Sequence, residues 1–166
     1  MKLYIRQKMF TLKDRFTVKD QDQQDIFTVE GKFLSIGKKL TVFDPSGAQV
    51  IYLEQKVFSF LPKVDVYFDG QLVFTIKKKL TFLRQSYVLE GDTWTVEGDF
   101  WAHQYQVLDG PDVIARISKA FISWGDYYEV DIKSDQDVRK VLAIVLAIDI
   151  AMAAAQKTTS NATPSS

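Results

Sequence analysis

The chain has 166 residues, of which 46% are hydrophobic and 13% aromatic, enough apolar material for one sizeable core. Lys plus Arg and Asp plus Glu both number 21, so the chain lacks the basic excess typical of nucleic-acid binders, and we expect no nucleic-acid partner. The absence of cysteine excludes disulfides and thiolate chemistry and fits a reducing compartment. The first eight residues lack the apolar stretch of a secretory signal, so we expect a cytoplasmic protein that starts at Met1.

Short segments with the two-residue period of β-strands follow one another through most of the chain. In the segment 71–79, for example, Leu72, Phe74 and Ile76 alternate with their neighbours and would face the core. The same alternation predicts about twelve strands, with ends uncertain by about two to four residues. These lie near 3–10, 15–20, 25–31, 39–44, 48–55, 64–69, 71–79, 86–90, 93–98, 103–108, 112–118 and 126–132.

An internal repeat and a set of turn sequences indicate how these strands are connected. Residues 27–33 (FTVEGKF) return 67 positions later as residues 94–100 (WTVEGDF). Turn-forming residues rich in Asp, Gly and Pro separate successive strands at 44–47, 69–70 and 109–112. Such residues accept or preset the backbone angles of hairpin reversals, so the chain is predicted to form consecutive antiparallel hairpins.

Residues 138–155 form a nearly unbroken apolar stretch at the end of the chain. A helix that is apolar on every side must be covered on every side, and the preceding strands are the only material that can cover it. A transmembrane span is the alternative, but Asp149 interrupts the run well before the roughly 20 apolar residues that crossing requires. We therefore expect no transmembrane span.

The strands and the helix together predict a mainly β fold, a closed antiparallel barrel of about twelve strands around a central hydrophobic C-terminal α-helix. Closure would satisfy every strand edge and cover the helix at once. We expect a single domain over residues 1–156, followed by a disordered polar tail at 157–166.

Three features of the chain resemble bacterial members of the LURP-one-related group, the YxjI-like proteins. They are the two aromatic-Thr-Val-Glu-Gly units, the hairpins that begin with an Asp turn, and the terminal helix VLAIVLAIDIA. That group belongs to the tubby C-terminal-like superfamily, so the resemblance implies a closed barrel around a central helix, as in phospholipid scramblases. Tubby itself binds phosphoinositide headgroups through basic residues, which implies an anionic lipid as a candidate ligand but assigns no individual residue here.

Basic clusters at the predicted strand ends are the candidate ligand-binding residues. If they meet at one rim, they would attract phosphate groups by charge-assisted hydrogen bonds. The alternative is that these side chains are solvated and protect strand edges against aggregation. By alternation, Lys78 lies on the core face and must either extend to solvent or pair with a carboxylate. The candidates are Lys38, Lys39, Lys77, Lys78, Lys79 and Arg84.

Residue types that carry catalysis are sparse. His103 is the only histidine, which leaves no multi-histidine metal centre and no evident base for a nucleophile. Glu30 and Glu97 occupy equivalent repeat positions, which duplication explains better than acid–base catalysis does. None of the eight glycines has nucleotide-binding spacing. We therefore expect no enzyme, no cofactor and no metal.

Aromatic residues before the last strand are a second candidate surface. Trp124, Tyr127 and Tyr128 flank a reversal, where they would form an exposed aromatic interface. Core packing is the alternative. Asp149 lies on the least apolar stripe of the helix and would emerge at a mouth of the barrel. It would serve there as a pocket carboxylate or, as the alternative, as a hydrogen-bonded or solvated aspartate near the helix end.

These patterns predict a non-enzymatic binding module. Its partner would be an anionic lipid headgroup, another phosphorylated ligand or a protein, and the module would lie in the cytoplasm or peripherally at the membrane. The alternative function is a small-molecule pocket protein or an enzyme that acts at a barrel mouth near Asp149.

Overall fold

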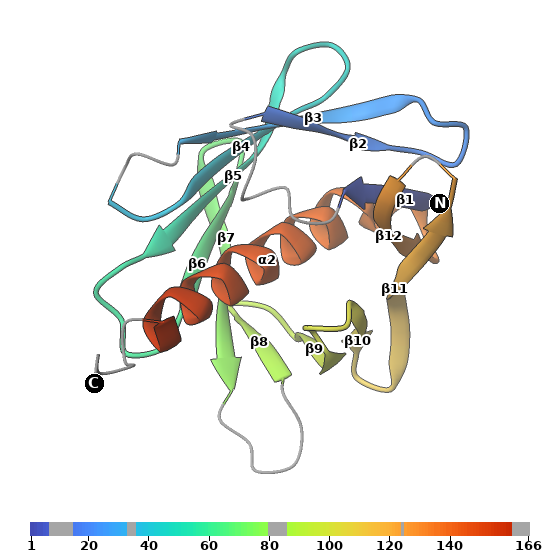
Figure 1. Cartoon of the computed structure of the whole chain (residues 1–166). Coiled ribbons are helices and arrows are strands. Elements are labelled where there is room, and N and C mark those ends of the chain that lie inside the picture. Colours follow the sequence, from blue (N-terminus) through green and yellow to red (C-terminus); the bar gives the residue numbers. More distant parts are fainter. Residues whose placement is uncertain (7–14, 33–35, 80–85, 124, 161–166) are drawn as a thin grey trace.

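The computed structural model describes residues 1–6, 15–32, 36–79, 86–123 and 125–160. These residues form a closed antiparallel barrel with one long helix through it, as predicted (Figure 1). Each strand pairs with its neighbours in sequence, and β1 closes the barrel against β12. The strands are β1 (Lys2–Arg6), β2 (Arg15–Lys19), β3 (Asp25–Lys32), β4 (Lys39–Phe43), β5 (Gln49–Lys56), β6 (Lys63–Phe68), β7 (Gln71–Lys79), β8 (Ser86–Glu90), β9 (Trp94–Asp99), β10 (Gln104–Asp109), β11 (Asp112–Ile122) and β12 (Gly125–Ile132).

The strand prediction fails at one place. Strand β11 continues to Ile122, four residues beyond its predicted end but within the stated uncertainty, and residues 7–10 of the first predicted strand lie outside the described residues. Leu72 was expected to face the core but is 55% exposed, because a bulge between β6 and β7 shifts the register. Val66 pairs with Phe74 whereas the next residue, Tyr67, pairs with Leu72, so one residue of β7 is extra and alternation reverses there.

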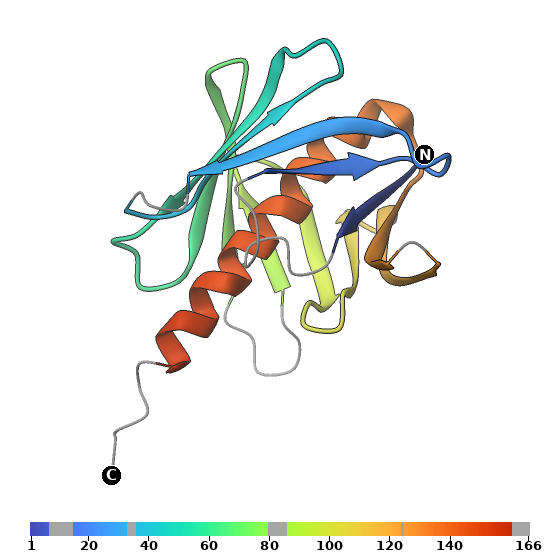
Figure 2. The same ribbon diagram turned by 45° about the horizontal axis from the view of Figure 1, so that its top comes forward.

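The helix α2 (Val138–Ser160) follows a short 3-10 turn, η1 (Asp135–Asp137). Every residue from 141 to 151 is buried, so the strands cover the helix on all sides. No described helix has the length and apolarity that crossing a bilayer requires. In Figure 2 the C-terminal part of α2 extends past the strands.

The helix continues past the predicted start of the polar tail. Residues 157–160 were expected to be disordered, but they belong to α2. Three alanines and Gln156 precede them, and these are favourable helix formers that allow the helix to propagate. Residues 161–166 of the predicted tail lie outside the described residues.

The barrel has two distinct ends. At the first, which we call the turn end, lie the hairpins β2–β3, β4–β5, β6–β7, β8–β9 and β10–β11 and the start of α2. At the second, which we call the lysine end, β3, β5 and β7 finish and β4, β6 and β8 begin. The antiparallel topology fixes this division, because alternate connections lie at opposite ends of every strand.

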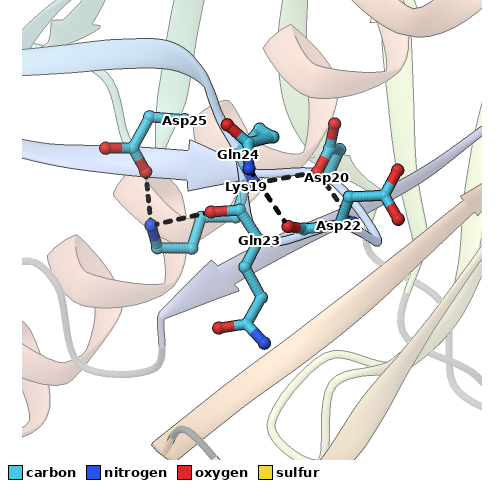
Figure 3. Close-up of polar contacts among 6 residues, drawn as sticks. All are labelled: Lys19, Asp20, Asp22, Gln23, Gln24 and Asp25. Atoms are coloured by element: carbon cyan, nitrogen blue, oxygen red, sulfur yellow. Dashed lines mark hydrogen bonds and ion pairs between the residues drawn. The ribbon is translucent and has the colours of Figure 1, made fainter.

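Aspartates organise the turns of the turn end. In the β2–β3 turn, Asp20 Oδ1 accepts hydrogen bonds from the backbone N–H groups of Asp22 and Gln24, both at 2.9 Å (Figure 3). Asp44 makes the same pair of contacts two and four residues further on, with Ser46 and Ala48. A short acidic side chain that replaces missing backbone partners is the physical reason for Asp in these turns.

Two basic residues fix the start of α2 at this end. Arg139 donates hydrogen bonds to the Val50 carbonyl, with Nε at 2.8 Å, and its Nη2 lies 3.0 Å from Asp69 Oδ1. Lys140 Nζ lies 2.7 Å from Asp92 Oδ2. These contacts reach the β4–β5, β6–β7 and β8–β9 turns, so the helix is held to three hairpins as it enters the barrel.

Candidate functional site at the lysine end

Strand register places a row of lysines side by side at the lysine end. Lys32 of β3 lies directly opposite Lys39 of β4. On the neighbouring strands, Lys63 of β6 lies opposite Lys56 of β5 on one side and opposite Lys77 of β7 on the other. Like charges directly opposite one another on a sheet are destabilising, so this arrangement works against folding stability. We call Lys32, Lys39, Lys56, Lys63 and Lys77 the lysine row.

Carboxylates compensate only part of the row. Lys39, Lys56 and Lys77 pair with Glu54, Asp65 and Glu90 at 3.1, 3.0 and 3.1 Å. The carboxylate partners raise the pKa of Lys39 and of Lys56, whose hydrogen bonds to Glu54 and Asp65 are the main cause. Lys39 and Lys56 therefore stay positively charged at any physiological pH.

Lys63 and two residues at the end of β7 differ from these three. Among the described residues, no carboxylate pairs with Lys63, Lys78 or Lys79. Lys63 and Lys78 are half-buried and Lys79 is exposed. The middle of the row therefore carries positive charge that the described part of the chain does not balance.

The predicted basic residues meet at this end. Lys38 directly precedes β4 and Lys39 begins it, and Lys77, Lys78 and Lys79 finish β7, so strand topology brings the two clusters to one rim. Arg84 lies outside the described residues. The idea that these lysines protect free strand edges does not fit a closed barrel, because β4 to β8 are paired on both sides.

Sequence patterns missed Lys32, Lys56 and Lys63 and the loop between the last two. Residues 57–62 (VFSFLP) connect β5 to β6, and Phe58 and Phe60 in this loop are 99% and 98% exposed. The sequence signal was present as an apolar loop between two lysines, where polar turn residues are usual. Only the barrel register shows that these two lysines lie directly opposite each other.

The predicted aromatic interface is wrong for the two residues that can be placed. Tyr127 is 8% exposed and Tyr128 is 1% exposed, so both side chains are buried rather than available to a partner. Tyr128 faces the barrel interior, where its ring stacks on His103 with centroids 4.6 Å apart. Trp124 lies outside the described residues.

A buried polar cluster lies inside the barrel around Asp149. The Tyr128 hydroxyl donates to Asp149 Oδ2 at 2.5 Å, and His103 Nε2 lies 3.9 Å from Oδ1. His103 adopts a φ of 51°, in the left-handed region that costs energy for a residue other than glycine. Among the fully buried side-chain polar atoms of the described residues, the Tyr105 hydroxyl is the one without a hydrogen-bond partner.

Burial controls the ionisation of this cluster. It raises the pKa of Asp149 to about 7, against the opposing effects of the Tyr128 hydrogen bond and of Lys38. The pKa of His103 is lowered by burial and by Lys119, and burial raises the pKa of Tyr87 to about 12. Asp149 is only 7% exposed, so the predicted opening of this carboxylate at a barrel mouth is wrong.

An open groove of about 990 Å³ lies elsewhere, on the outer face of β9 to β12. Carboxylates exceed basic groups in its lining, which includes Glu97, Asp99, Asp131, Arg116 and the half-exposed Trp101. None of the sequence-predicted ligand-binding residues lines it. Within the described ranges, no three His, Cys, Asp or Glu side chains lie close enough to hold a metal ion.

A closed antiparallel barrel threaded by an apolar C-terminal helix defines the class of this protein. The same fold occurs in the X-ray structure of a protein from Arabidopsis thaliana, with a TM-score of 0.61 and 16% identity over 89% of this chain and 90% of the other. The LURP-one-related family model matches residues 1–149. The chain is also 38% identical over 152 residues to the uncharacterized protein YxjI of Bacillus subtilis (strain 168), covering 92% of this chain and 94% of the relative. The chain therefore belongs to the LURP-one-related family, as its sequence features predicted.

Proposed function

We propose that this protein is a non-enzymatic binding module that engages anionic lipid headgroups on a membrane surface through its lysine end. The observation that carries this proposal is the position of Lys63, with Lys56 and Lys77 directly opposite on its two sides. Phosphate oxygens between these ammonium groups would form charge-assisted hydrogen bonds and relieve their repulsion. A bound headgroup thus supplies the compensation that the described residues of the chain do not.

The charge distribution of the whole barrel supports the same orientation. The formal net charge is zero, yet aspartates occupy every hairpin turn of the turn end. A molecule with one acidic and one basic end orients in the field of an anionic surface, with the basic end toward it. The protein would therefore approach a membrane along the barrel axis and keep the turn end in solution.

Several finer assignments belong to this proposal. They are membership of the tubby C-terminal-like superfamily, a bacterial source, and a cytoplasmic location with peripheral attachment to the membrane. Each fits a small barrel of the LURP-one-related family whose basic end faces an anionic leaflet.

Vesicle co-sedimentation tests the proposal directly. The protein should be retained on vesicles with anionic lipid and not on neutral vesicles, and retention should weaken as salt rises. The double substitution Lys78→Glu/Lys79→Glu should reduce the partition coefficient at least about tenfold, since each lysine near an anionic surface contributes about 1 kcal/mol. The control is Arg116→Glu/Lys133→Glu, which makes the same change in net charge at exposed residues away from the lysine end.

The outcomes separate three possibilities. Equal loss in the two double variants would mean that net charge, and not the lysine end, controls binding. No difference between anionic and neutral vesicles would rule out recognition of lipid charge. If lipid binding is ruled out in this way, the next candidate ligand of the lysine end is a protein partner with an acidic surface.

The alternative function, a small-molecule or enzymatic role at Asp149, meets a steric obstacle. The carboxylate is 7% exposed, and His103 and Tyr128 lie against it. We therefore favour the lysine end.

A further inference from the structure

Exposed apolar side chains project from the lysine end, beside the lysine row. Phe58 and Phe60 are almost fully exposed, and Val57 is 40% exposed in the same loop. Ile36, in the connection between β3 and β4, is 81% exposed. Burying such side chains is favourable and leaving them in water is not, so a group of them marks a contact surface. We call Ile36, Val57, Phe58 and Phe60 the apolar tip.

The structure shows that the two loops of the apolar tip adjoin. A Cβ atom built on Gly37 would lie 2.8 Å from a Val57 methyl group, so Val57 packs closely against the backbone next to Ile36. Gly37 has a φ of +84°, and glycine is the residue that combines this angle with so close an approach. The backbones of Lys38 and Gln55 are hydrogen-bonded at 2.9 Å, which joins the bases of the two loops.

Lysines flank the apolar tip on both sides. Lys56 directly precedes the β5–β6 loop and Lys63 follows it, and these two are opposite each other in the sheet. Lys38 and Lys39 follow Ile36 in the same way. Apolar side chains surrounded by cations match a bilayer surface, which presents anionic headgroups above hydrocarbon. A soluble phosphorylated compound would use the lysines and leave the phenylalanines exposed.

We propose that the apolar tip inserts into the headgroup–acyl boundary of the bilayer whose anionic headgroups the lysine row binds. This inference rests on the proposed function and deepens it, because it adds an apolar attachment in the bilayer to the headgroup contact and names the side chains that make it. Insertion would orient the barrel axis along the membrane normal. The β5–β6 loop would then lie in the bilayer, and the acidic turns would lie farthest from it. Two weak attachments, one electrostatic and one apolar, would together give stable peripheral binding.

A single introduced cysteine can report insertion, because the chain contains no cysteine. Phe58→Cys carries an environment-sensitive nitrobenzoxadiazole label, and Leu72→Cys, a 55% exposed apolar position in the strand β7 near the turn end, carries the same label as the matched control. On anionic vesicles the label at 58 should shift its emission to shorter wavelength and be quenched by nitroxide-labelled lipid, whereas the label at 72 should do neither.

A binding assay gives a second readout that does not depend on the label. Phe58→Ser/Phe60→Ser should weaken partitioning into anionic vesicles by about tenfold or more, since each phenylalanine loses its apolar contribution. Leu72→Ser/Val73→Ser removes two exposed apolar side chains near the turn end and should leave partitioning unchanged. Circular dichroism and thermal melting of all four variants establish that they are folded.

The results distinguish failure of this inference from failure of the proposed function. If the wild-type protein binds anionic vesicles and loses binding on Lys78→Glu/Lys79→Glu, but the label at 58 stays in water, insertion is wrong and headgroup binding stands. If the phenylalanine variant loses binding while lipid charge has no effect, insertion stands and the electrostatic proposal is wrong. If the wild-type protein binds no vesicle, both are wrong.

Discussion

The two ends of the barrel use charge in opposite ways. At the turn end, Arg139 lies near Asp69 and the Val50 carbonyl and Lys140 lies near Asp92, and the aspartates satisfy backbone groups of their own turns. At the lysine end, like charges face each other across strands, and large apolar side chains lie in solvent. The turn end therefore contributes to folding stability, whereas the lysine end lowers it, as binding surfaces commonly do.

The buried carboxylate near the lysine end should produce the largest effect. Because the folded-state pKa of Asp149 is raised to about 7, the folded protein holds a proton there that the unfolded chain has released, and stability falls as pH rises toward and through 7. A rise from pH 5 to pH 8 should therefore lower the free energy of unfolding by about 2 to 3 kcal/mol through this carboxylate. Urea denaturation of the wild type and of Asp149→Asn at both pH values measures it as the difference between their pH dependences.

His103 works in the other direction and serves as the internal control. Its pKa is lowered in the folded state, so its contribution to stability rises with pH. Comparing wild type with Asp149→Asn cancels most of this contribution, because His103 is present in both. An equal pH dependence in the two proteins would show that Asp149 is ionised throughout.

The start of the helix should give the next largest effect, at the turn end. Arg139→Ala removes the hydrogen bonds to the Val50 carbonyl, the ion pair with Asp69 and the guanidinium that lies 4.3 Å from the Phe68 ring centroid. Hydrogen bonds from a charged group typically contribute more than neutral ones, so we expect a loss of about 2 kcal/mol in the free energy of unfolding. The exposed Arg116→Ala is the matched control and should change stability by less than about 0.5 kcal/mol. Similar losses in the two variants would contradict this account of the turn end.

A turn aspartate should give a smaller effect of the same sign. Asp20→Ala removes the acceptor for the backbone N–H groups of Asp22 and Gln24 (Figure 3) and should cost about 1 kcal/mol in chemical denaturation. Asp22→Ala, in the same turn, removes a carboxylate whose side chain makes none of these bonds. If both substitutions cost the same, charge rather than backbone capping is what the turn requires.

The smallest expected effect has the opposite sign and lies at the lysine end. Lys63→Gln removes the repulsion with Lys56 and Lys77 and should stabilise the protein by about 0.5 kcal/mol, while weakening vesicle binding. Lys19→Gln at the turn end is the comparison, because it removes an ion pair with Asp25 and should not stabilise. Denaturation at low and high salt tests the origin, since screening should reduce the gain from Lys63→Gln.

Local patterns predicted the fold well because they follow from burial alone. Strand alternation and Asp-rich turns located the hairpins, and an apolar helix with no free face required a surrounding sheet. The prediction failed at Leu72, where one extra residue changes the strand register. It also failed at the end of α2, where residues that favour helix continue beyond the apolar segment. Such features depend on neighbouring strands or on chain cooperativity that a periodicity does not contain.

Sequence patterns predicted only part of the candidate site. The lysine clusters at 38–39 and 77–79 were visible as charge, but Tyr127 and Tyr128 looked like a surface because a turn sequence precedes them, and the structure buries both. Lys63 was not predicted, because an isolated lysine beside a proline is ordinary in a sequence. Its importance comes from Lys56 and Lys77, which are 7 and 14 positions away along the chain and adjacent across the sheet.

The sequence by itself determined the barrel, its helix and the family, because hydrophobic periodicity, turn chemistry and an all-apolar helix are local properties that leave few ways to bury the same surface. Only the tertiary structure decided which charges meet, that Asp149 lies beneath His103, and that Phe58 and Phe60 project beside the lysine row. The physical reason is that electrostatic and contact energies depend on distances in space, and in an antiparallel barrel those distances are set by strand register.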